Sequence, residues 1–94
     1  EKPLAQTLEQ GLKIKELAKK HNMFIQCGFI ERFNPVVSEL KRVLENEEVI
    51  NIDFSRTNRL SSRITDVDVV LDLMIHDIDL ALYLNGPVKS CSSR

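Results

Sequence analysis

The spacing of apolar residues predicts a helix near the start of the chain. Between residues 5 and 21 apolar side chains recur every three or four positions, and lysines and glutamates occupy the other side. Thr7 is the expected N-cap, with Gln10 three residues later as in a capping box. Asn22 is expected to adopt the left-handed conformation that ends many helices.

A second amphipathic helix is predicted over residues 35–46. Its valines and leucines repeat at the helical spacing. Asn34 followed by Pro35 is a favourable helix start, because Asn is a good N-cap and proline suits the first helical position.

Three shorter segments have the pattern of β-strands. Residues 23–28 are mostly apolar and end in glycine, residues 49–57 alternate apolar with polar, and residues 88–92 follow an Asn-Gly-Pro stop. The polar segment 58–67 has no consistent period and is predicted to be a loop. This order predicts an α+β fold, with helices forming one layer on a small mixed or antiparallel sheet.

The third helix, expected over residues 68–83, carries most of the chain's candidate chemistry. Its polar side chains fall within roughly 80° around the helix axis at 3.6 residues per turn. They are Asp68, Asp72, His76, Asp79 and Tyr83. The rest of the circumference is apolar apart from Asp77, which is typical of a buried helix. Carboxylates are seldom buried unless they are paired, so this stripe is a candidate site.

Asp72 and His76 stand four residues apart, the spacing at which side chains meet on a helix. A positioned Asp–His pair can act as a general acid and base. The alternative is a structural hydrogen bond that satisfies two buried polar groups. Metal binding through Asp72, His76 and Asp79 is a third interpretation, but one helix that supplies all three ligands is a weak metal signal. No metal is therefore predicted.

Three further residues are candidates for binding. Lys2 precedes Pro3 and is otherwise an ordinary surface lysine. Arg32 and Asn34 lie at a bend between elements, where functional residues concentrate, and could hydrogen-bond a polyol or a phosphate. The alternative for Arg32 is a local ion pair with Glu31 or Glu39.

Composition argues against a nucleic-acid-binding protein and against a membrane-spanning one. The 94 residues include 13 basic and 14 acidic ones, for a net charge of −1, and no basic tract suits nucleic acid. No apolar run is long enough to cross a membrane. Cys27 and Cys91 lack the spacing of a zinc site and suggest a reduced, cytoplasmic protein. The chain has neither a leader nor a finished last strand, so we expect it to be part of a longer protein.

Three motifs in order carry a family resemblance: EKP at the start, GFIERFNP about 25 residues later, and DLMIHDIDLALYLNG near the end. Together they resemble the glucose–fructose oxidoreductase and inositol dehydrogenase family. Within it, ERFNP followed by MIHDID is most similar to dehydrogenases of UDP-linked N-acetyl amino sugars. The resemblance covers nearly the whole chain.

The resemblance implies a site and a cofactor. The intact protein would be an NAD- or NADP-dependent dehydrogenase that oxidises a secondary hydroxyl of a sugar or nucleotide sugar. Lys2, Asp72 and His76 would be catalytic, with His76 as the acid/base. Lys2 and Arg32 would contact the cofactor, and Arg32, Asn34, Asp72 and His76 the substrate.

The resemblance also divides the chain. Residues 1–22 would be the EKP segment and a connecting helix, and residues 23–94 the start of a substrate and oligomerisation domain that follows a Rossmann domain. Homo-oligomers would form through the sheet.

Two features depart from the family pattern. The sequence has no G-x-G-x-x-G, so no cofactor is expected to bind this chain alone, and the chain alone is expected to be inactive. Asp68 stands where the family usually has glycine. The alternative to an enzyme is a ligand-sensing or assembly domain of the same fold, although such a domain has no need of Lys2, Asp72 and His76 together.

Overall fold

The computed structural model describes residues 1–57 and 68–93. These residues form three α-helices, α1 (Leu8–Lys20), α2 (Pro35–Leu44) and α3 (Ile75–Asn85), with two shorter helical turns. The first turn, η1 (Ile30–Phe33), is a 3₁₀ turn directly before α2. The second, η2 (Val70–Met74), is a π-helical turn that leads into α3.

The ends of the helices follow the sequence signals. The Thr7 side chain accepts the Gln10 backbone N–H at 3.3 Å, which caps α1. Asn22 follows α1 with φ of 51°, as expected of a left-handed residue. Gly86, with φ of 83°, ends α3 in a conformation that favours glycine.

The predicted α+β fold is wrong for the residues that the structure describes, because none of them forms a strand. Residues 23–28 run from α1 to η1 without ladder partners, and so do residues 49–57 after α2 and residues 88–92 after α3. An extended segment becomes a strand only when its backbone groups pair with another segment. The two-layer arrangement and the sheet expected to mediate assembly are therefore absent here. The predicted loop 58–67 lies outside the described residues.

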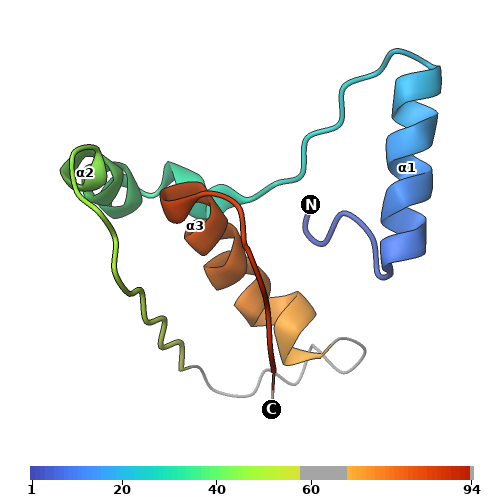
Figure 1. The fold of residues 1–94 in the computed structure, drawn as a ribbon. Helices are drawn as coiled ribbons and strands as arrows, with labels where there is room; N and C mark the ends of the chain where they lie inside the picture. The colour runs from blue at the N-terminus through green and yellow to red at the C-terminus, as the bar shows by residue number, and fades with distance from the viewer. Residues whose placement is uncertain (58–67, 94) are drawn as a thin grey trace.

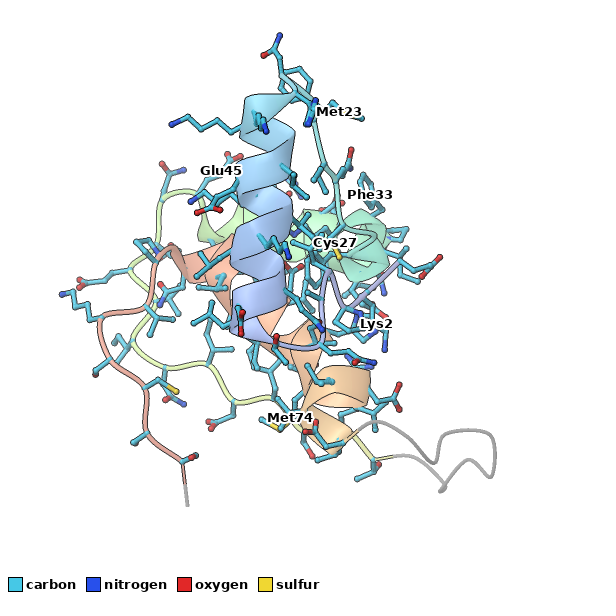
Figure 2. All side chains as sticks on the ribbon, turned by 90° about the vertical axis from the view of Figure 1, so that its right-hand side faces the viewer. Lys2, Met23, Cys27, Phe33, Glu45 and Met74 are labelled. Carbon is cyan, nitrogen blue, oxygen red and sulfur yellow. The ribbon has the colours of Figure 1, made fainter. Side chains whose placement is uncertain are left out.

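The helices divide into two parts (Figure 1). α1 stands apart, joined to the rest by residues 21–29. η1 lies between α2 and α3 and packs against both. Figure 2 shows the described side chains on this ribbon, turned by 90°. Val37 and Leu80 are the buried apolar residues of the described chain, and Asp79 is its buried charged residue.

Much of the apolar surface of η2 and α3 is uncovered. Met74, Ile78 and Leu82 are each at least 40 % exposed. The prediction of a helix buried around its apolar circumference is therefore wrong within the described residues. Only the side that carries Asp79 and Leu80 is enclosed.

Removal of the α2 cap should weaken the start of that helix. The Asn34 Oδ1 accepts the Val36 backbone N–H at 3.0 Å. Asn34→Ala should cost about 0.5–2 kcal/mol. Hydrogen exchange in the first turn of α2 should then accelerate about 2- to 30-fold, as measured by mass spectrometry on the full-length protein. Asn46→Ala, in the exposed turn after α2, is the control. Unchanged exchange in Asn34→Ala would show that the cap contributes nothing.

Candidate functional site

The candidate site forms where the N-terminal segment meets the first turns of the third helix. Lys2 Nζ lies 3.2 Å from Asp72 Oδ1 and also donates a hydrogen bond to the Asp72 backbone carbonyl. Both side chains are about one-fifth exposed. The contact joins residues 70 positions apart in the sequence. Lys2 is therefore not the ordinary surface lysine that composition alone would allow.

The N-terminal segment is held beside residues 27–28. Cys27 Sγ donates to the Glu1 backbone carbonyl at 3.4 Å, and the Glu1 backbone lies against Gly28. The Lys2–Pro3 peptide bond is cis. These contacts place Lys2 between residues 27–28 and η2. The EKP motif therefore contacts both the start of the GFIERFNP motif and the DLMIHDIDLALYLNG motif.

His76 lies one helical turn after Asp72, in the first turn of α3. It is partly buried, and its Nδ1 is enclosed without a hydrogen-bond partner among the described residues. The structure shows no hydrogen bond between Asp72 and His76 in that part of the chain. The Asp72 carboxylate instead bonds Lys2, and η2 has π-helical geometry, for which the α-helical spacing of the two side chains no longer holds.

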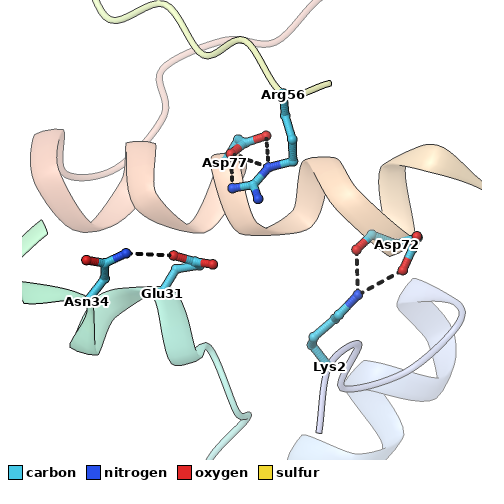
Figure 3. A network of polar contacts seen from close by, with 6 residues as sticks. All are labelled: Lys2, Glu31, Asn34, Arg56, Asp72 and Asp77. Atoms are coloured by element: carbon cyan, nitrogen blue, oxygen red, sulfur yellow. Dashed lines mark hydrogen bonds and ion pairs between the residues drawn. The ribbon is translucent and has the colours of Figure 1, made fainter. Parts of the chain in front are cut away.

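Acidic residues of η2 and α3 pair with cations from three different segments. Lys2 pairs with Asp72, Arg56 pairs with Asp77 at 2.8 Å, and Arg32 pairs with Asp79. Lys2 and Arg56 approach the helix from different sides (Figure 3). The sequence did not predict the Arg56 pair, because 21 positions separate its members and no local pattern links them. Each pair neutralises a carboxylate and ties a distant segment to the helix.

Arg32 and Asn34 make structural contacts, Arg32 with α3 and Asn34 within the bend. Arg32 binds Asp79 rather than Glu31 or Glu39, the partners considered from the sequence. Asn34 caps α2 and donates from Nδ2 to Glu31 at 3.4 Å (Figure 3). Of the predicted site residues, Lys2 and Asp72 are thus in contact, and His76 follows Asp72 by four residues at the start of α3. Arg32 and Asn34 belong to the neighbouring bend.

Hydrogen bonds to carboxylates raise the pKa values of Arg32 and Arg56. The bond to Asp79 raises the pKa of Arg32 and outweighs the opposing effect of burial. The bond to Asp77 raises the pKa of Arg56 in the same way. Both guanidinium groups therefore stay charged at any working pH, and neither can act as an acid or base.

Within residues 1–57 and 68–93, no group of three or more His, Cys, Asp or Glu side chains has the geometry of a metal site. Cys27 and Cys91 are both free thiols. In the same part of the chain, no helix has both the length and the apolar character needed to cross a bilayer.

The chain is similar in sequence to part of several curated oxidoreductases. It is 32 % identical over 93 residues to UDP-N-acetylglucosamine 3-dehydrogenase of Acidithiobacillus ferrooxidans, with 92 % of the chain and 27 % of the relative covered. It is 32 % identical over 91 residues to inositol 2-dehydrogenase 2 of Saccharopolyspora erythraea, with the same coverage. The uncharacterized oxidoreductase YrbE of Bacillus subtilis is 28 % identical over 93 residues, also at 92 % and 27 %.

The chain spans about a quarter of the length of these curated relatives. No protein-family model matches it, and no solved structure matches it significantly. The similarity to named dehydrogenases is consistent with the family resemblance found in the sequence. It extends over 92 % of the chain.

Proposed function

We propose that this chain is the substrate side of the active site of an NAD- or NADP-dependent oxidoreductase. The substrate would be a sugar, an inositol or a nucleotide sugar with a secondary hydroxyl. The observation that carries the proposal is the contact between Lys2 and Asp72, which sets an ammonium group one helical turn before a half-buried histidine. The similarity to two named dehydrogenases supports it.

The residues present suit the reacting end of a nicotinamide cofactor and not its pyrophosphate. Lys2 Nζ uses two donors on Asp72 and has a third N–H for another acceptor. The three glycines of the chain form no G-x-G-x-x-G turn, the usual pyrophosphate cradle. In the proposal, residues outside this chain hold the rest of the cofactor.

The chemistry assigns a role to each side chain. Oxidation of a secondary alcohol removes the hydroxyl proton and a hydride from the same carbon, which becomes a carbonyl carbon; bound nicotinamide supplies the hydride acceptor. His76 takes the hydroxyl proton as general base. Lys2 donates a hydrogen bond to the hydroxyl oxygen and stabilises the negative charge that develops there. Asp72 holds the Lys2 ammonium group in place.

A turnover assay on the full-length protein tests this proposal. Myo-inositol, scyllo-inositol and UDP-N-acetylglucosamine would each be supplied with NAD⁺ or NADP⁺, and formation of reduced cofactor followed by absorbance. We expect reduction with at least one of these alcohols. Ligand binding without any cofactor reduction would contradict the proposal. It would favour the alternative of a ligand-sensing or assembly domain.

A further inference from the structure

Arg32 and Asp79 form an ion pair with restricted geometry. Arg32 Nε donates to Asp79 Oδ2 at 2.8 Å, and Nη2 donates to Oδ1 of the same carboxylate. The Asp79 side chain is only 5 % exposed. Two parallel hydrogen bonds from a planar guanidinium fix its orientation as well as its position. The pair therefore sets the angle between η1 and α3, not only their separation.

Aromatic rings restrict the same guanidinium further. Its centre lies 5.1 Å from the centroid of the Tyr83 ring and 5.6 Å from that of Phe29. Cations at such distances from aromatic faces are attracted to them. Tyr83 lies one turn after Asp79 on α3, and Phe29 directly precedes η1. The two rings therefore add contacts on both of the elements that the ion pair joins.

Asp79 is three residues from His76, a separation that puts both side chains on one face of α3. A helix held at Asp79 cannot turn about its axis without displacing His76 in the same sense. Lys2 holds the same helix from its other end, at Asp72. The direction in which His76 points is thus determined by cations on both sides of it.

From this geometry we infer that Arg32 is a positioning residue, which acts through Asp79 to fix the rotation of α3 and so the placement of His76. This inference rests on the proposed function. It gives Arg32 a different role from the cofactor and substrate contacts that the family resemblance implies. Lysine could supply the charge of Arg32 but not the paired hydrogen bonds, so Arg32→Lys separates charge from orientation.

Steady-state kinetics of the full-length protein test the inference. Arg32→Lys and Asp79→Asn should each lower kcat about 10- to 100-fold, since small displacements of a catalytic group are that costly. KM should change little. The double variant should be no worse than the more impaired single variant, because both remove one interaction. Arg42→Lys, in an exposed pair with Glu39 on α2, is the matched control and should behave as wild type.

A different pattern would overturn the inference. If Arg32→Lys raises KM at unchanged kcat while Asp79→Asn is silent, Arg32 contacts the substrate directly. Circular dichroism would confirm that the variants are folded, and Arg32→Lys alone decides the question if Asp79→Asn does not fold.

A second measurement keeps this test separate from the proposed function. If the wild-type protein has no turnover, NMR signals of the His76 ring report its placement without any reaction. These signals should shift in Arg32→Lys and Asp79→Asn and stay unchanged in Arg42→Lys. Unmoved His76 signals in the first two variants would refute a positioning role whether or not the protein is an enzyme.

Discussion

Replacing His76 with alanine in the full-length protein should lower kcat by about 10²–10⁴-fold, the usual worth of a positioned acid or base. The imidazole is the group proposed to take the hydroxyl proton, and its enclosed Nδ1 has no partner among the described residues whose loss would destabilise the fold. Stability should therefore change little. Turnover would be followed by the absorbance of reduced cofactor, and stability by thermal denaturation.

The other histidine of the chain provides a matched control. His21 follows the last residue of α1 and is exposed. His21→Ala should retain wild-type kcat. If His76→Ala instead unfolds the protein while its remaining folded fraction keeps full activity, His76 is a structural histidine and the acid/base assignment is wrong.

Lys2→Met should be the second most damaging change, with kcat lowered by about 10²–10³-fold. That is the cost of removing one hydrogen-bond donor from a developing oxyanion. Methionine retains much of the length of the side chain but neither the charge nor the donors, so Asp72 also loses its partner. Rates measured with saturating substrate and cofactor would isolate the effect on the chemical step.

Lys20→Met, near the exposed end of α1, controls for the loss of a positive charge. It should leave kcat unchanged. Lys2→Arg should recover only part of the activity, because the planar guanidinium cannot reproduce the position of the ammonium group. Full activity in Lys2→Met would mean that the Lys2–Asp72 contact only links two segments of the chain.

The helices could be predicted from the sequence because their signals are local. Thr7 and the pair Asn34-Pro35 mark helix starts through their own side chains and backbone, and Gly86 marks an end. The strands were wrong because pairing is not local. The alternating pattern of residues 49–57 describes which side chains favour burial, whereas a strand also needs a neighbour for its backbone.

For the candidate site, the sequence indicated which residues to consider but not which of them bond to one another. Family resemblance singled out Lys2, Asp72 and His76; the structure pairs Lys2 with Asp72, and the catalytic roles of all three stay predictions. Their exact partners were not predictable, since Asp72 bonds a lysine 70 residues away rather than the histidine four residues on. The Arg32–Asp79 pair spans 47 residues, and only the need of a buried carboxylate for a cation hinted at it.

Transfer of a labelled hydride tests the central proposal most directly. The full-length protein would be incubated with NAD⁺ or NADP⁺ and an alcohol carrying deuterium on the carbon of its secondary hydroxyl, and the reduced cofactor would be analysed by mass spectrometry. We expect one deuterium in the nicotinamide with wild-type protein and far less label at equal times with His76→Ala. A reduced cofactor without deuterium, or none with any inositol or nucleotide sugar, would contradict assignment of this chain to a hydride-transferring dehydrogenase.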